Sequence, residues 1–189
     1  MPQMNMKRSI ALLLFAVSLA VYWITGSPTV VFWDVGEFIA AAFLLQVPHP
    51  PGAPLFLLIG RVFGMIPIGS DVAVRMHFIS VLASALTVMM TYLIIVRFIA
   101  MFRGQPQSLA DRLTVFGGAA VGALSLAFGK TFWFNALEAE VYGMSMLLMS
   151  LMLWLGLRWF ERATWERSDV YLLLVAYLIG LAVGVHLLS

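Results

Sequence analysis

Long apolar segments separated by short polar ones form the main pattern along this chain. Six stretches contain no Asp, Glu, Lys or Arg, and they are residues 9–33, 38–60, 77–96, 113–129, 141–157 and 170–189. A helix needs about 20 mostly apolar residues to cross the hydrocarbon core of a bilayer. The pattern therefore predicts an all-α polytopic membrane protein.

The second apolar stretch differs from the others because four prolines interrupt it: Pro48, Pro50, Pro51 and Pro54. Each proline removes a backbone donor, and the hydrocarbon core holds no water that could satisfy the freed carbonyls. We therefore expect this stretch to stay on one side of the membrane. It should form two short interfacial helices, at residues 39–45 and 55–66, on either side of a proline turn.

The distribution of cations decides the number of spans. We expect five, at about residues 9–26, 76–97, 113–129, 141–158 and 170–188. With residues 27–75 kept outside as one loop, eight of the eleven Lys and Arg residues lie inside: Lys7, Arg8, Arg97, Arg103, Arg112, Arg158, Arg162 and Arg167. A crossing within residues 55–68 would move six of these outside, against the positive-inside rule. The amino terminus is therefore expected to be cytoplasmic and the first loop to lie on the non-cytoplasmic face.

Composition supports this class and excludes others. Hydrophobic residues make up 62% of the 189 residues and charged residues only 11%, with a mean hydropathy of +0.99. These values exclude an ordinary water-soluble domain. The formal net charge of +2 gives no basic surface for nucleic acid. Because there is no cysteine, disulfides, thiol nucleophiles and cysteine-ligated metals are excluded as well.

Two alternatives concern the ends of the chain. The first segment also has features of a signal peptide, because Lys7 and Arg8 precede an apolar run, although that run is longer than usual and no A-x-A site ends it. The last apolar stretch reaches Ser189 without a polar tail. We expect residues 1–189 to form a single membrane domain, the amino-terminal part of a larger module.

Paired acids begin the first outer loop. If Asp34 starts a helix, the spacing of three residues places Asp34 and Glu37 on one face, near a helix amino terminus that favours anions. The simpler interpretation is an N-cap with an acidic first turn. Against it, an apolar loop beside a membrane rarely carries paired acids without a task. His49 stands between prolines in a stiff turn, which suits a binding residue as well as a plain helix connection.

A second polar cluster precedes the fourth expected span. Glu138 and Glu140 are two residues apart, so in a helix they would diverge by about 200° and only one would face a shared site. We favour Glu138 narrowly. Lys130 precedes aromatic residues typical of an interfacial belt.

Three more residues lie at or near the outer ends of the expected spans. Arg75 begins the second span, where its guanidinium would form a bidentate contact with a phosphate or extend to lipid headgroups. Lys130 has the same two interpretations. His186 is near the outer end of the fifth span and could approach the same site, but a single membrane histidine more often packs between helices.

Taken together, these motifs resemble a known enzyme class. They are Trp33-Asp34-x-Gly36-Glu37-Phe38, His49-Pro50-Pro51-Gly52-Ala53-Pro54-Leu55-Phe56, Arg75 and Glu138-Ala139-Glu140-Val141-Tyr142-Gly143-Met144. The pattern resembles the integral-membrane C-type glycosyltransferases, and most closely the bacterial relatives of the eukaryotic transmembrane protein O-mannosyltransferases. The resemblance runs through the whole chain but corresponds to the amino-terminal part of such an enzyme.

The resemblance implies transfer of a sugar, such as mannose, from a polyprenyl-phosphate carrier to a hydroxyl of a protein or glycan, with inversion at the anomeric carbon. Asp34 would then be the general base and Glu37 its support or a donor-binding residue. His49 would line the donor or acceptor site, Arg75 would hold the carrier phosphate, and Glu138 or Glu140 would match the acid of the second outer loop. We also expect Lys130 and Tyr142 to bind substrate. With bacterial relatives, the membrane would be the inner membrane and the first loop would be periplasmic. Some C-type enzymes use a divalent metal near the first-loop acid and others do not, so the resemblance leaves the cofactor open.

Two hypotheses from other classes remain. A transporter would place acids within spans, facing an aqueous path. A structural subunit of a membrane complex would rely on small-residue packing faces, such as Gly118 with Gly122 and Gly180 with Gly184. The acids gathered in the outer loops favour the enzyme.

Overall fold

The protein is entirely helical. A computed structural model describes residues 2–67, 69 and 71–187, and all regular elements in these residues are α-helices. They are α1 Pro2–Thr25, α2 Val35–Leu44, α3 Pro54–Met65, α4 Val72–Arg103, α5 Leu109–Ala127, α6 Lys130–Ala136, α7 Val141–Glu161 and α8 Asp169–Val183. The expected all-α class is confirmed.

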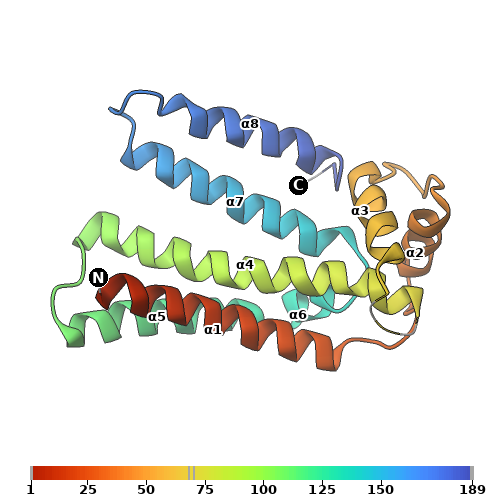
Figure 1. Cartoon of the computed structure of the whole chain (residues 1–189), viewed down its shortest axis with the longest axis horizontal. Helices are drawn as coiled ribbons and strands as arrows, with labels where there is room; N and C mark the ends of the chain where they lie inside the picture. The colour runs from red at the N-terminus through yellow and green to blue at the C-terminus, as the bar shows by residue number, and fades with distance from the viewer. Residues whose placement is uncertain (1, 68, 70, 188–189) are drawn as a thin grey trace.

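Five helices lie roughly alongside one another and form the body of the molecule (Figure 1). The central helix is α4, which packs against α1, α5 and α7, while α8 packs against α7. Four of the five, namely α1, α4, α5 and α7, are long and apolar enough to cross a membrane. The chain is an integral membrane protein.

The lengths of two helices differ from those expected. At 1.5 Å per residue, the 32 residues of α4 measure about 48 Å, longer than the ~30 Å hydrocarbon core, so this helix extends beyond the expected span at both ends. The fifth expected span, residues 170–188, corresponds to α8, which has only 15 residues. It ends where Gly184 turns and its carbonyl accepts the Leu55 N–H at 2.7 Å. Residues 188 and 189 lie outside the described part of the chain.

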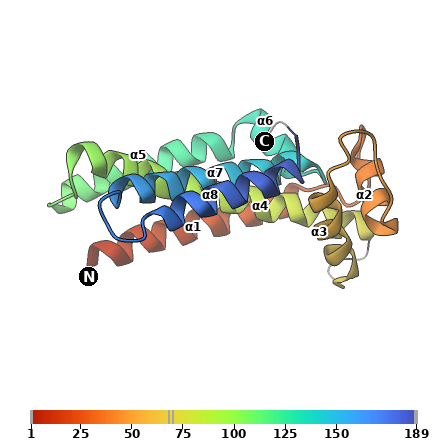
Figure 2. The same ribbon diagram turned by 90° about the horizontal axis from the view of Figure 1, so that it is seen from above.

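The first loop stays at one end of the bundle. Figures 1 and 2 show α2 and α3 gathered at the end opposite the amino terminus, with the α4–α5 and α7–α8 connections at the amino-terminal end. Neither short helix runs through the bundle, as the prolines predicted. Asp34 therefore lies at the opposite end from Arg103 and Arg162. The membrane-surface placement of residues 27–75 stays a prediction.

An apolar core holds the two short helices on the end of the bundle. It combines residues of α2, α3 and the start of α4 with Ala139, Val141, Met144 and Val185. The rings of Phe38 and Phe56 meet edge to face across α2 and α3, with centroids 5.7 Å apart. This core joins the first loop to the start of α7 and the end of α8.

Close packing also fixes the start of α7 on α4. A Cβ at Gly143 would lie 3.0 Å from the Ser84 Oγ and 3.3 Å from the backbone of Ser80. Glycine permits this close approach without displacing either serine. The Ser80 hydroxyl donates to the buried carbonyl of Glu140 at 3.1 Å. The backbone that carries Glu140 is therefore anchored on the central helix.

Candidate functional site

Asp34 stands at the amino terminus of α2 without acting as its side-chain cap. It occupies the N-cap position, yet its side chain makes no capping hydrogen bond. The preceding Trp33 has a left-handed backbone with φ of 68°. Non-glycine residues in this region store strain, which is found mostly where the surrounding structure enforces it for a purpose. The carboxylate is thus exposed and available at a helix terminus that favours anions.

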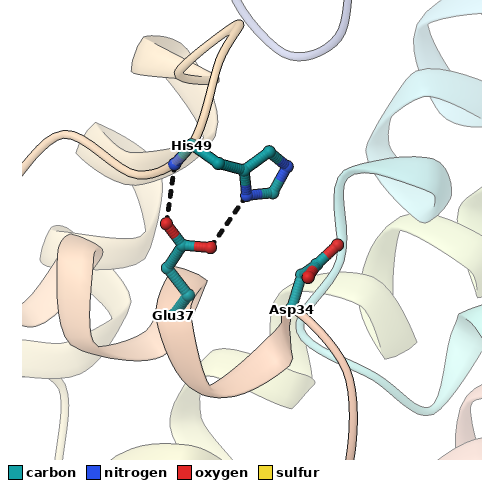
Figure 3. A group of neighbouring side chains, drawn as sticks. All are labelled: Asp34, Glu37 and His49. Carbon is teal, nitrogen blue, oxygen red and sulfur yellow. Dashed lines mark hydrogen bonds and ion pairs between the residues drawn. The ribbon is translucent and has the colours of Figure 1, made fainter.

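Glu37, one turn further along α2, holds His49 by two atoms. The backbone N–H of His49 donates to Oε1 of Glu37 at 2.6 Å, and the ring Nδ1 lies 2.8 Å from Oε2. Figure 3 shows both contacts, with Asp34 beside them on the same helix. The ring of Phe38 also meets the His49 ring edge to face at 5.6 Å. The orientation of the imidazole is therefore set by α2, twelve residues away in the chain.

This contact moves both protonation equilibria. The hydrogen bond to Glu37 raises the pKa of His49, and the hydrogen bonds from His49 lower the pKa of Glu37. The raised pKa means that the stabilising contribution of His49 is present at low pH and lost as pH rises through that pKa. The lowered pKa means that the contribution of Glu37 is lost as pH falls through that value. The contact is strongest between the two pKa values.

A small polar cavity of about 50 Å³ unites the two outer clusters. Asp34, His49, Glu140 and Tyr142 line it, and all four were expected at the site. The remaining lining residues come from α2, from the proline turn, from the start of α7 and from the end of the described chain: Phe38, Pro51, Gly52, Ala53, Val141, Val185 and His186. Ala53, which ends the turn, also has a left-handed backbone, with φ of 42°.

Glu140 is the buried acid of this cavity, with 8% of its surface exposed. Burial raises its pKa to about 7, and the nearby charge of Asp34 acts in the same direction. Two carboxyl groups with different environments thus face one cavity, Asp34 exposed and Glu140 buried. In such a pair, the exposed Asp34 can accept a proton while the buried Glu140 stays protonated and neutral.

A larger apolar cavity of about 530 Å³ adjoins the polar one. Tyr142 and His186 line both, and their rings lie 5.7 Å apart. The larger cavity lies among α4, α5, α6 and α7 and is lined mostly by apolar atoms, with Met146 and Met149 on its α7 side. A polar compartment and an apolar compartment therefore meet at one pair of aromatic side chains.

Besides Glu37, which contacts the cavity-lining His49, three expected site residues are not among those lining either cavity. Arg75 donates to the carbonyl of Gly64 at 3.0 Å and so joins α4 to the end of α3. Lys130 is exposed at the first position of α6. Glu138 is partly buried two residues before Glu140, and burial raises its pKa. Their substrate-binding roles stay predictions.

His186 lines both cavities, although the sequence favoured a packing role for it. The available signal was its position near the same membrane boundary as the acids. His77, the third histidine, is buried, and its Nε2 lies 3.0 Å from the carbonyl of Thr29. It joins α4 to the α1–α2 connection.

The chain is similar to a known protein family. The sequence pattern described as the protein O-mannosyl-transferase TMEM260 N-terminal domain matches residues 34–189. The chain belongs to this family. The match begins at Asp34 and includes every residue that lines the polar cavity. The polar cavity therefore lies within the family domain.

Two relatives carry the same description. The chain is 26% identical over 161 residues to protein O-mannosyl-transferase tmem260 of Dictyostelium discoideum, covering 84% of this chain and 18% of that protein. It is 32% identical over 159 residues to protein O-mannosyl-transferase TMEM260 of Mus musculus, covering 82% and 20%. The chain thus spans about a fifth of the length of these relatives. No solved structure matches the chain.

The family domain also holds a donor set for a metal ion. One ligand atom each from Asp34, Glu37 and His49 lie within 4.8 Å of one another, and all three residues are exposed. Metal–ligand distances of about 2.0–2.6 Å are compatible with this spacing. Both oxygens of Glu37 already accept from His49, however. A cation bound here would compete with that contact, so the described geometry favours Glu37 as the partner of His49.

Replacing Glu37 with glutamine is expected to lower the pKa of His49 toward its ordinary value. The amide cannot offer two anionic oxygens to the imidazolium, so the protonated ring loses its main stabilisation. NMR titration of selectively labelled histidine in the whole protein measures the shift. Glu138→Gln, which removes an acid that does not contact His49, is the matched control. An unchanged His49 titration in Glu37→Gln would refute the proposed pairing.

Proposed function

We propose that the whole protein transfers a mannose residue from a polyprenyl-phosphate carrier to a hydroxyl group of a protein serine or threonine. Family membership supports the reaction class, because both relatives are described as protein O-mannosyl-transferases. The observation that carries the proposal is the meeting of a polar cavity, lined by Asp34, His49 and Glu140, with a large apolar cavity.

The two cavities suit an amphiphilic donor. The polar cavity of about 50 Å³ is comparable to the share of liquid volume of one or two waters, about 30 Å³ each, and is too small for a whole sugar. It admits the reacting hydroxyl and its surroundings. The adjoining cavity of about 530 Å³ has room for part of the donor and, being apolar, favours an isoprenoid chain. The sugar would lie between them, beside Tyr142 and His186.

In the proposed reaction Asp34 is the general base. The acceptor oxygen attacks the anomeric carbon as its proton passes to the Asp34 carboxylate. The bond between the anomeric carbon and the phosphate oxygen breaks, and polyprenyl phosphate leaves with the electron pair. Attack opposite to the leaving group inverts the anomeric configuration. A positioned base supplies about 10²–10⁴-fold of the rate enhancement in reactions of this kind.

The other site residues support this step. Glu37 fixes His49, whose imidazole would hydrogen-bond the sugar or the acceptor. Glu140, in its neutral form, would donate a hydrogen bond without repelling Asp34. Arg75 and Lys130 would meet the carrier phosphate only if the donor reached beyond the described cavities, and Glu138 would help to bind the acceptor. Tyr142 would contact the donor where the cavities join.

The proposed orientation places this reaction on the non-cytoplasmic face. Asp34, Glu37, Glu138 and Glu140 lie at the end of the bundle opposite Lys7, Arg97 and most other cations. The positive-inside rule assigns the cation-rich end to the cytoplasm. In a bacterium the site would then be periplasmic, at the surface of the inner membrane.

Neither alternative class has comparable support. A transporter would carry acids along its spans, but in the described chain the acids of the four long helices are Asp111 and Glu161, each near a helix end. A purely structural subunit would not need a buried acid beside an exposed one.

The test is transfer of labelled mannose from polyprenyl-phosphate mannose by the purified whole protein, with a serine- and threonine-containing acceptor. We expect label in the acceptor, removable by β-elimination. GDP-mannose as donor is the control and should give no transfer. Absence of transfer from the lipid-linked donor, or equal transfer from the nucleotide donor, would overturn the proposed function.

The rate of transfer is expected to fall as pH rises through about 7, the pKa of the buried Glu140. Above that pH Glu140 ionises and loses the proton with which its neutral form would donate a hydrogen bond at the site. Glu140→Gln copies the neutral carboxylic acid, so it should remain active and lose this basic limb of the pH–rate profile. Persistence of the same limb in the glutamine variant would show that another group titrates.

A further inference from the structure

A group of cations lies on three helices at the amino-terminal end of the bundle, the end opposite α2 and α3 in Figure 1. The Arg97 guanidinium lies 4.1 Å from the centre of the Trp154 ring, and the Lys7 ammonium lies 6.0 Å from the same ring. These residues come from α4, α7 and α1. Arg158, one turn after Trp154, completes what we call the cationic cluster: Lys7, Arg97 and Arg158.

One carboxylate faces these three cations. Glu161 lies 2.9 Å from Nε of Arg97 and 3.9 Å from Arg158, through its two oxygens. Nη1 of Arg97 is buried and has no hydrogen-bond partner among the described atoms. The cluster therefore keeps an excess of positive charge that Glu161 does not neutralise.

Topology alone does not explain this arrangement. The positive-inside rule accounts for cations in the loops at this end, but not for two of them meeting on one tryptophan with Arg158 joined to Arg97 through Glu161. Tryptophan is enriched at headgroup level, and basic pockets between membrane helices on this side bind the headgroups of anionic lipids. The side chains of Arg97 and Arg158 are only 12% and 26% exposed, so they are held in place rather than extended into solvent.

We propose that the cationic cluster binds the phosphate headgroup of an anionic phospholipid. Lys7 and Arg158 contact the phosphate oxygens, while Arg97 adds positive charge from behind Trp154. The acyl chains lie along the apolar surfaces of α1 and α7. This site is separate from the proposed transfer reaction and does not depend on it.

The experiment measures retention of phosphatidylglycerol by the whole protein, using native mass spectrometry after extraction from nanodiscs of phosphatidylcholine with phosphatidylglycerol. Lys7→Gln and Arg158→Gln should each weaken binding by about fivefold, the effect of about one cationic contact near a membrane surface. Arg167→Gln removes the same charge from the exposed α7–α8 connection and should leave binding unchanged. Two cluster variants are used because either one alone could fail to fold.

Each outcome decides the proposal. Selective retention of phosphatidylglycerol, weakened by the cluster variants and not by Arg167→Gln, supports it. An equal loss in Arg167→Gln would mean that total charge alone is responsible, which overturns it. Inorganic phosphate is the second probe: displacement of the lipid by millimolar phosphate would assign the cluster to a free anion and would likewise overturn the proposal.

Discussion

Replacing Asp34 with asparagine is expected to lower the rate of mannose transfer by about 10²–10⁴-fold, the contribution of a positioned general base. The amide has nearly the same size as the carboxylate but cannot accept the proton of the attacking hydroxyl. The loss should appear in kcat rather than in KM for the donor, because the base acts in the transition state. Steady-state transfer by the whole protein measures both constants.

The matched control is Asp71→Asn. Asp71 also lies at the outer end of the bundle and begins a helix, but its side chain accepts from the Ala73 N–H and so caps α4. Asparagine caps a helix about as well as aspartate, so this variant should fold and transfer normally. The Asp34 side chain makes no capping hydrogen bond, so Asp34→Asn loses none and should also insert into the membrane normally. Undiminished kcat in Asp34→Asn would remove Asp34 from the role of base.

Replacing Gly143 with leucine is expected to destabilise the protein by about 1–3 kcal/mol, the usual cost of forcing extra atoms into close packing. The new side chain would meet the hydroxyl of Ser84, which can rotate away, and the backbone of Ser80, which cannot move without shifting α4. Displacement of α7 would also move Tyr142 and Glu140. Both the midpoint of thermal unfolding and the transfer rate should therefore fall.

Gly156→Leu provides the control for this effect. Gly156 lies on the same helix, but a Cβ placed there meets no atom within 4 Å in the described structure. Gly156→Leu changes the helix propensity and the apolarity of α7 as much as Gly143→Leu does, but it creates no clash. We expect little change in its unfolding midpoint. If Gly143→Leu were as stable as Gly156→Leu, the close contact between α4 and α7 would be wrong.

Much of the fold could be predicted from local sequence features. Four prolines within one apolar stretch predicted that it would not cross, and α2 and α3 indeed lie at the end of the bundle. Asp34 does begin a helix and Glu37 lies in its first turn, which was the condition for expecting both acids on one face. The proline turn and the spacing of the acids depend only on residues that are close together in the chain, so both can be read directly from the sequence.

The details of the site depend on contacts between distant segments. The argument that only one of Glu138 and Glu140 could face the site assumed a shared helix, but Glu140 has an extended backbone at the N-cap of α7. The seven-residue helix α6 is too short to produce a clear periodic pattern. His186 reaches the site because α8 ends early and the chain turns at Gly184 against Leu55. None of these follows from spacing along the chain.

The most direct test of the central claim is to map where the donor lies. The measurement is photo-crosslinking of the whole protein with polyprenyl-phosphate mannose that carries a diazirine on its first isoprene unit, followed by peptide mass spectrometry. We predict crosslinks at or beside Tyr142 and His186, abolished by excess unlabelled donor. Competed crosslinks confined to the cation-rich end, near Arg97 or Trp154, would contradict a transfer site built on Asp34.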